Sequence, residues 1–255
     1  MSEEAPSGVL ERAVTILSAF GQEDQALSLA ELVKRTGLPK TTVHRLLAEL
    51  VGVRLLERDP DGRHRLGSRL FELGMHASVE RRILEVAMPF LQDLYERVHE
   101  LVHLGVREGH EVVYVAKLGG HRQARAPSRI GGRMPLHCTA IGKVLLATSG
   151  DELLDEVLGG DLERRTPHTI TAPGLLRRQL RETLRTGVAF EREESTLGLV
   201  CVAAAVLDRD DRPVAAISLT GPTSRFRPEQ HAGAVRAAAA GVAATLARRT
   251  ELLEG

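Results

Sequence analysis

Two short helices joined by a tight turn are the pattern that most restricts what this chain can fold into. The first follows the stretch "SLAE", a capping box in which Ser28 and Glu31 satisfy each other's free backbone amides. We expect it to end near Thr36, because Gly37 suits the left-handed conformation that follows a helix end. Pro39 then takes the first position of the second helix, where its missing amide loses no hydrogen bond.

The second helix has one apolar side and one polar, basic side. Its apolar residues recur at helical spacing and predict a single buried stripe: Val43, Leu46, Leu47 and Leu50. The other side carries Lys40, Thr41, Thr42, His44 and Arg45. A preceding helix over residues 9–20 has its own apolar side, formed by Leu10, Ala13, Val14 and Leu17. Together the three helices describe a helix-turn-helix arrangement.

A β-hairpin is predicted directly after these helices. Residues 55–58 and 64–66 can pair across the Asp-Pro-Asp-Gly turn at 59–62, whose residue types favour tight turns. Such a hairpin would be the wing of a winged helix, and it carries Arg58, Arg63, His64 and Arg65. A solvated hairpin without a partner is the alternative interpretation.

Charge is distributed unevenly along a chain whose formal net charge is zero. Between Lys34 and Arg69 there are nine Lys and Arg residues but only four Asp and Glu residues. A local excess of positive charge beside such a helix is suited to phosphates, which predicts a nucleic-acid partner.

The rest of the chain mixes helices and strands. We expect a helix at 68–75, a linker near 78–84 and a helix through Val98, followed by two strands that turn at Glu108 and Gly109. Further helices are predicted near 140–147, 151–158, 175–186 and 228–249, and two strands at 199–207 and 214–220. Strands with an antiparallel ending and interspersed helices indicate an α+β domain separate from the first.

Two features bear on location and cofactors. Cys138 and Cys201 lie far apart without metal spacing, and the acidic start "MSEEAPSG" is unlike a signal peptide. No apolar run reaches the roughly 20 residues that span a bilayer. We therefore expect a cytoplasmic protein with reduced thiols, no membrane association, no metal and no cofactor.

Read in order, six segments of the chain resemble the IclR family of bacterial transcriptional regulators. They are "LSLAELVKRTGLPKTTVHRLL", "RHRLG", "PLHCTAIGKVLLA", "TPHTIT", "EESTLGLVCVAAAV" and "AAISLTGP". The acidic, polar residues 1–7 predict a disordered tail. The resemblance implies a winged helix-turn-helix DNA-binding domain at 8–67, a linker helix at 68–84, and a GAF-like effector-binding and oligomerisation domain at 85–255. It also implies binding to double-stranded operator DNA as a homodimer or homotetramer, modulated by a small molecule, in this case a carboxylic acid.

The candidate DNA-binding residues lie on the second helix, at its neighbour's cap and on the wing: Ser28, Lys40, Thr41, Thr42, His44, Arg45, Arg63 and Arg65. Residues near the start of a recognition helix approach base edges in the major groove. We expect Arg45 to contact a base, because its guanidinium matches the O6 and N7 acceptors of guanine. The threonines suit phosphate or a thymine methyl group. Plain surface is the alternative for each.

The resemblance also implies an effector site, made of Met134, Ala140, Ile141, Glu191, Leu199, Cys201 and Ser218. A helix starting near 139–142 would offer its free amides to a carboxylate. We expect Cys201 and Ser218 to reach the ligand from alternate faces of neighbouring strands, although each of these residues is also compatible with ordinary core. Glu191 stands where many relatives have Asp. With Glu193 and Glu194 it predicts a solvated charged loop, not a metal site.

Catalysis is not expected. His137 and Cys138 are adjacent, and neighbours on an extended chain point in opposite directions, which is poor geometry for a nucleophile and its base. The sequence thus predicts a transcriptional regulator, with repression favoured over activation. An architectural DNA-binding protein without ligand control and an enzyme on a GAF-like scaffold are the alternatives. The effector and the operator stay open.

Overall fold

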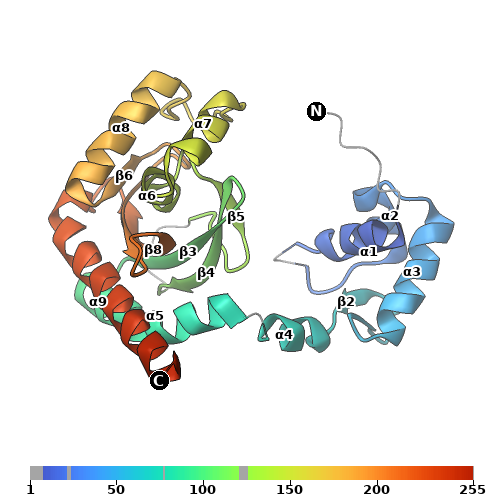
Figure 1. The fold of residues 1–255 in the computed structure, drawn as a ribbon. Coiled ribbons are helices and arrows are strands. Elements are labelled where there is room, and N and C mark those ends of the chain that lie inside the picture. The colour runs from blue at the N-terminus through green and yellow to red at the C-terminus, as the bar shows by residue number, and fades with distance from the viewer. Residues whose placement is uncertain (1–7, 22–23, 77, 121–125, 255) are drawn as a thin grey trace. The chain divides into compact units, whose positions relative to one another are not determined.

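The computed structural model describes residues 8–21, 24–76, 78–120 and 126–254. The chain forms two compact units, Met1–Ser78 and Val79–Gly255 (Figure 1). Each unit has its own hydrophobic core. The predicted tail at 1–7 and residue 77 of the predicted linker lie outside the described residues.

The N-terminal unit is a winged helix-turn-helix, as predicted. Its elements are α1 (Val9–Ser18), α2 (Leu29–Thr36), α3 (Lys40–Gly52), β1 (Leu56–Arg58), β2 (His64–Leu66) and α4 (Ser68–Gly74). The β1 and β2 strands pair antiparallel, with Leu56 opposite Leu66. The four residues of the predicted α3 stripe are all buried, and they pack with α1 and α2 residues in one core.

Local signals set the boundaries of α2 and α3. Ser28 caps α2, with its Oγ accepting from the Glu31 amide at 3.3 Å while Glu31 Oε2 accepts from the Ser28 amide at 2.8 Å. Gly37 follows α2 with φ of 67°, a conformation that favours glycine. The placement of Pro39 inside α3 was wrong by one residue. Its ψ of 137° is extended, so Pro39 is the N-cap and α3 begins at Lys40.

The apolar side predicted for α1 is correct for Ala13 and Leu17, which pack against the core of this unit, and wrong for Leu10 and Val14. Ile16 is fully buried, whereas Leu10 and Val14 are exposed. At 3.6 residues per turn, Val14 lies about 200° around the helix from Ile16, and Leu10 about 240°, so both point away from the core. The helix therefore carries an exposed apolar side in addition to its buried one.

The C-terminal unit is built on a six-stranded antiparallel sheet with the order β5-β4-β3-β8-β7-β6. The strands are β3 (Leu101–Glu108), β4 (Glu111–Leu118), β5 (Arg133–Pro135), β6 (Ala189–Arg192), β7 (Leu199–Leu207) and β8 (Pro213–Pro222). The predicted hairpins β3–β4 and β7–β8 are confirmed. The short edge strands β5 and β6 were not predicted.

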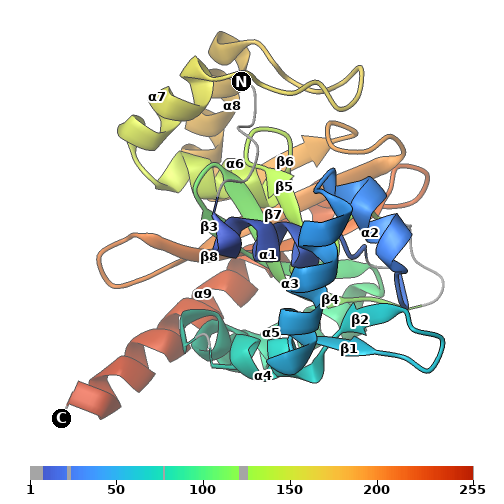
Figure 2. The same ribbon diagram turned by 90° about the vertical axis from the view of Figure 1, so that its right-hand side faces the viewer.

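Helices cover both faces of this sheet (Figure 2). One face packs against α5 (Ser78–Val98) and α9 (Pro228–Glu254), and the other against α6 (Ala140–Thr148), with α7 (Asp151–Gly159) and α8 (Pro173–Thr186) beyond it. The linker predicted at 78–84 corresponds to the first turns of α5, a helix of 21 residues.

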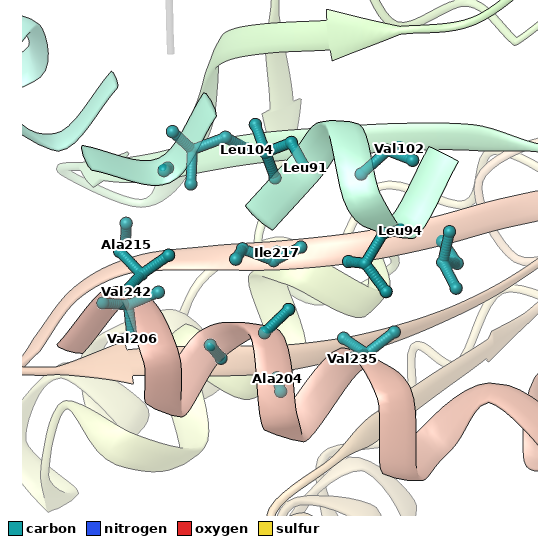
Figure 3. Packing of buried hydrophobic residues seen from close by; sticks show 14 of the residues in the cluster. Leu91, Leu94, Val102, Leu104, Ala204, Val206, Ala215, Ile217, Val235 and Val242 are labelled. Carbon is teal, nitrogen blue, oxygen red and sulfur yellow. The ribbon is translucent and has the colours of Figure 1, made fainter. Parts of the chain in front are cut away.

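The larger core lies on the face covered by α5 and α9. Leu91 and Leu94 of α5 and Val235 and Val242 of α9 pack on strand residues such as Ile217 (Figure 3). This apolar layer fixes the sheet, whose opposite face holds the polar side chains considered below. None of the helices in the described part of the chain combines the length and apolarity needed to cross a membrane.

Candidate nucleic-acid interface and effector site

The outer side of α3 carries the polar residues that the sequence assigned to DNA. Lys40, Thr41, His44 and Arg45 are exposed, and Thr42 is half-buried. The buried stripe of leucines and Val43 on the opposite side holds this face outward. An exposed helix side with a cation at its start is the geometry that a major groove accepts.

The three candidate DNA-binding arginines, Arg45, Arg63 and Arg65, are paired with carboxylates on the protein surface. Arg45 Nη1 lies 2.5 Å from Glu49 Oε1, one turn along α3, and both side chains are about half exposed. On the wing, Arg65 Nη2 lies 2.6 Å from Glu57 Oε2. Arg63 Nη2 donates to the Ala26 carbonyl at 3.0 Å and lies 3.1 Å from Glu31 Oε2. Exposed pairs of this kind are worth at most about 1 kcal/mol, so phosphates can replace these carboxylates.

One expected wing residue is inside the unit. His64 is buried, and its backbone pairs with Leu27 through two hydrogen bonds of 2.7 Å. Burial lowers the pKa of His64 below its ordinary value. The wing therefore joins the segment before α2, and its exposed cations are Arg58, Arg63 and Arg65.

A groove of about 540 Å³ runs between this wing and the segment before α2. Asp24, Glu31, Asp59 and Asp61 line it beside the wing arginines. The positive excess expected from the sequence is therefore not uniform over the unit: carboxylates gather beside the wing, while the start of α3 presents Lys40 without a neighbouring acidic residue in its first turn.

In the C-terminal unit, the candidate effector residues gather between the sheet and α6. Met134, Ala140 and Ile141 belong to one apolar cluster, and Cys201 packs against it. Glu191 pairs with Cys201 across β6 and β7. Leu199, buried at the start of β7, is paired with Pro222 and lies outside that cluster.

Cys201 and Ser218 lie on the same face of the sheet, which corrects the expectation that they reach a ligand from alternate faces. Cys201 pairs with Thr220, and Ser218 lies two residues from Thr220 on β8. Paired residues, and residues two apart on a strand, share a face. The Thr220 hydroxyl donates to Cys201 Sγ at 3.1 Å, which adds a polar residue that the sequence did not single out.

The start of α6 is capped by the chain itself. Thr139 is the N-cap, and its Oγ1 accepts from the Gly142 amide at 3.0 Å. A side chain at Gly142 would meet the Leu136 carbonyl oxygen at 2.3 Å, so only glycine fits there. The anion site expected at this helix start is therefore restricted to the amides of Ala140 and Ile141.

Glu191 and Glu194 are buried, so the solvated charged loop expected at 191–194 was wrong. Glu191 is 0% exposed, and its Oε1 accepts from the amides of Glu194 at 2.5 Å and Ser195 at 3.0 Å. Burial raises the pKa of the Glu191 carboxyl, while these amides and the Cys201 thiol act to lower it. The described residues contain no cluster of metal-ligating side chains.

Lys143 of α6 explains how Glu194 can be buried. Its Nζ lies 2.5 Å from Glu194 Oε1, and the two side chains are 1% and 5% exposed. The same nitrogen donates to Gln179 Oε1 at 2.8 Å and to the Phe190 carbonyl at 3.4 Å. The ammonium group thus has three acceptors and holds the 190–194 segment against α6 and α8.

The "TPHTIT" segment holds the same loop from its other side. The Thr166 hydroxyl donates to the Glu193 carbonyl at 2.6 Å, and the Thr169 hydroxyl donates to the Glu194 carbonyl at 2.6 Å. Both threonines are buried. Lys143 and the two threonines thus hold this loop in place. The amides that donate to the Glu191 carboxylate belong to the same loop, so they fix the direction of that carboxylate.

Two more residues of this sheet face were not singled out from the sequence. His103 is buried, and it hydrogen-bonds Ser218 Oγ at 3.4 Å and Ser128 Oγ at 2.8 Å. Burial, assisted by Lys117, lowers the pKa of His103 to about 3, so the ring is neutral near pH 7. Tyr114 lies beside it, with ring centroids 5.2 Å apart. Successive side chains of a strand point to opposite faces of the sheet, and this alternation along β3 and β4 was the sequence signal that could have placed both residues on this face.

The His137–Cys138 pair has no geometry for nucleophilic chemistry. His137 Nε2 donates to the Glu163 carbonyl at 3.0 Å. Cys138 is fully buried, and burial raises the pKa of its thiol to about 12. A thiol that stays protonated is a poor nucleophile.

Two family profiles match the chain. One, described as the IclR helix-turn-helix domain, covers residues 9–60, and the other, described as the C-terminal domain of the bacterial transcriptional regulator IclR, covers residues 75–244.

Named relatives and solved structures agree with these profiles. The HTH-type transcriptional regulator XynR of Escherichia coli is 38% identical over 218 residues, which is 85% of this chain and 86% of XynR. The transcriptional repressor IclR of the same organism is 30% identical over 87% of this chain and 82% of its own length. An IclR homologue from Microbacterium hydrocarbonoxydans, solved with 4-hydroxybenzoate, has a TM-score of 0.87 and 33% identity, and covers 94% of this chain and 99% of its own. The Thermotoga maritima IclR has a TM-score of 0.78 and 30% identity, and covers 93% of this chain and 98% of its own.

Proposed function

Because this chain belongs to the IclR family of bacterial transcriptional regulators, we propose that α3 and the wing read its operator and that a small acid bound beside α6 changes that binding. The observation that carries the DNA part is the exposed side of α3, held outward by its buried leucines. The contact residues are those predicted from the sequence: Ser28, Lys40, Thr41, Thr42, His44, Arg45, Arg63 and Arg65.

The effector part of the proposal rests on the buried polar groups between the sheet and α6. Free amides at Ala140 and Ile141 favour a carboxylate, since a helix start carries partial positive charge. The apolar walls given by Met134 and Ile141 suit an organic or aromatic acid. The homologue from Microbacterium hydrocarbonoxydans, solved with 4-hydroxybenzoate, supports the same ligand class.

Within this proposal the domain limits stay at 8–67 for DNA binding, 68–84 for the linking segment and 85–255 for the effector and oligomerisation domain. The protein is proposed to repress transcription, which its similarity to the transcriptional repressor IclR supports. The protein is proposed to act on DNA in the cytoplasm and to have no enzymatic activity, which the protonated thiol of Cys138 supports. An architectural protein without ligand control is the rival interpretation.

Selection of genomic fragments tests the proposal. We expect the purified full chain to retain one or a few fragments against scrambled competitor at moderate salt, because base contacts add sequence preference to phosphate binding. Thermal unfolding with a panel of small acids tests the effector part, since a ligand held only by the folded state raises the melting temperature. A retained fragment without any thermal shift would favour the architectural interpretation.

We also propose that the chain acts as a dimer, or a dimer of dimers, with α1 and α4 in one interface. Leu10 is 81% exposed and Phe71 is 72% exposed. The α4 helix has no buried residue within its own unit. Large apolar side chains left exposed on these two helices favour a protein contact. A second copy of the chain suits an operator that consists of two half-sites.

Leu10→Asp should weaken dimerisation, because burying a leucine side chain is worth about 1.5–3 kcal/mol and the change acts on both copies. Sedimentation equilibrium should show a dissociation constant raised by about tenfold or more. Leu175→Asp is the matched control, since Leu175 is a similarly exposed leucine on α8. Equal association of both variants would place the interface elsewhere.

A further inference from the structure

We propose that Ala48 of α3 contacts the methyl group of a thymine in the operator and thereby selects the base at that position. The inference rests on the proposed function, because it concerns the helix that is proposed to read DNA. It goes beyond that function in two respects. It adds a contact residue that the sequence did not single out, and it names the base that this residue reads.

The buried side of α3 determines which side chains point most directly outward. At 3.6 residues per turn, the four buried residues of α3 span about 100° of its circumference: Val43, Leu46, Leu47 and Leu50. Thr41 lies about 10° from the direction opposite the middle of this buried side, and Arg45 and Ala48 each lie about 30° from it. These three residues therefore form the middle of the outward side of the helix.

The remaining polar residues of α3 lie at the flanks of that outward side. They are about 70–110° from its middle: Lys40, Thr42, His44 and Glu49. Positions at the flanks of a helix in the major groove suit the phosphates on either side, whereas its middle faces the base edges. The exposure of the side chains agrees with this division, since Thr42 is half-buried and Ala48 is exposed.

The spacing of the outward residues is that of a helix that reads bases. Thr41, Arg45 and Ala48 follow one another at i, i+4 and i+7. In homeodomains, the residues of the third helix that read the major groove are spaced at i, i+3, i+4 and i+7. Ala48 therefore takes the last reading position, about 10.5 Å along the helix axis from Thr41.

The chemistry of the alanine side chain indicates which base it reads. Base edges in the major groove present hydrogen-bond donors and acceptors and, on thymine among the four bases, a methyl group. Alanine has no polar side-chain atom, so it cannot satisfy a donor or an acceptor, but it can remove the thymine methyl group from water. Arg45 and Glu49 pair with each other, and Ala48 remains exposed, so its methyl group is accessible to a base.

Replacing single thymines by deoxyuridine, in the genomic fragment that the full chain selects, tests the contact, because uracil lacks the methyl group and still pairs with adenine. We expect one thymine per half-site at which this change lowers affinity by about fourfold, the equivalent of about 0.8 kcal/mol for one buried carbon group. If no replacement changed the affinity, the inference would be overturned and the proposed function would stand. If the chain selected no fragment, both would fail.

Ala48→Gly assigns the contact to its residue. Without the alanine methyl group, the sensitive thymine and its uracil replacement should be bound equally well. The ratio of the two affinities is measured on the same protein, so the lower helix propensity of glycine cancels. Thr41→Ser is the matched control, because it removes a methyl group two turns away and should keep the fourfold ratio at that thymine. A ratio that persists in Ala48→Gly and disappears in Thr41→Ser would assign the contact to Thr41 and contradict the proposal.

Ala48→Leu tests whether this side chain faces the base edges. The change should leave the fold intact, because Ala48 is exposed and leucine favours a helix. A longer side chain would hold α3 away from the bases, so we expect operator affinity to fall tenfold or more. Ala240→Leu is the control, since Ala240 is an exposed alanine on α9 of the other unit, and it should bind the operator like the parent. Equal operator affinity of the two variants, with circular dichroism showing both folded, would contradict the proposal.

Discussion

Lys143→Met should lower the free energy of unfolding of the C-terminal unit by about 3–5 kcal/mol, the usual result when one partner of a buried ion pair is removed. Methionine fills most of the space but leaves the Glu194 carboxylate buried without its cation, and it leaves Gln179 and the Phe190 carbonyl without a donor. Chemical denaturation followed by circular dichroism measures the change. We also expect weaker acid binding, because the loop that directs Glu191 loses its contact with α6.

Two further variants separate the pair from general damage. Lys143→Met combined with Glu194→Gln should be more stable than Lys143→Met alone, because the second change removes the unpaired charge. Arg185→Met breaks an exposed pair with Glu182 and should change stability by less than about 1 kcal/mol. If Lys143→Met were as harmless as Arg185→Met, the buried pair would not hold the loop.

Arg45→Ala should weaken operator binding by about 1–3 kcal/mol and relax the preference at one base pair, because a bidentate contact to guanine would be lost. To contact a base, Arg45 must give up its ion pair with Glu49. Exposed pairs one turn apart on a helix are worth about 0.3–0.5 kcal/mol, so this cost offsets only a small part of the base contact. Competition binding against single-base variants of the selected fragment measures both effects.

Arg97→Ala is the matched control for Arg45→Ala. Arg97 forms the same kind of exposed pair one turn apart, with Asp93, but it lies on α5 of the other unit. Operator affinity should not change. If Arg45→Ala reduced binding to operator and random DNA equally, Arg45 would be a phosphate contact, and the base readout would fall to another residue of α3.

The winged helix could be predicted because its signals are local. The Ser28–Glu31 capping box, Gly37 and the Asp-Pro-Asp-Gly turn act through hydrogen bonds and φ preferences within a few residues. The displacement of Pro39 by one position is of the same scale as ordinary ambiguity at a helix end. Local chemistry is therefore sufficient to locate the candidate DNA-reading helix.

The effector site depends on contacts between distant residues, and these could not be read from the sequence. Glu194 reads as a solvated residue of an acidic run, and it is buried only because Lys143 lies against it from 51 residues earlier in the chain. The shared face of Cys201 and Ser218 depends on the register of β7 on β8. The exposure of Leu10 depends on which side of α1 packs on α2 and α3. The edge strands β5 and β6, three and four residues long, are too short for a period of two to be recognised.

The central claim is that α3 reads an operator and that an acid held beside α6 alters the reading. The most direct measurement is the affinity of the full chain for its selected genomic fragment and for a scrambled fragment, at one moderate salt concentration, with and without a small acid that shifts its melting temperature. The account predicts that the protein binds the selected fragment more tightly than the scrambled one, and that the acid changes the affinity for the selected fragment. Because such coupling is reciprocal, the DNA should change the affinity for the acid by the same factor. Equal affinity for both fragments, or an operator affinity that the bound acid leaves unchanged, would contradict it.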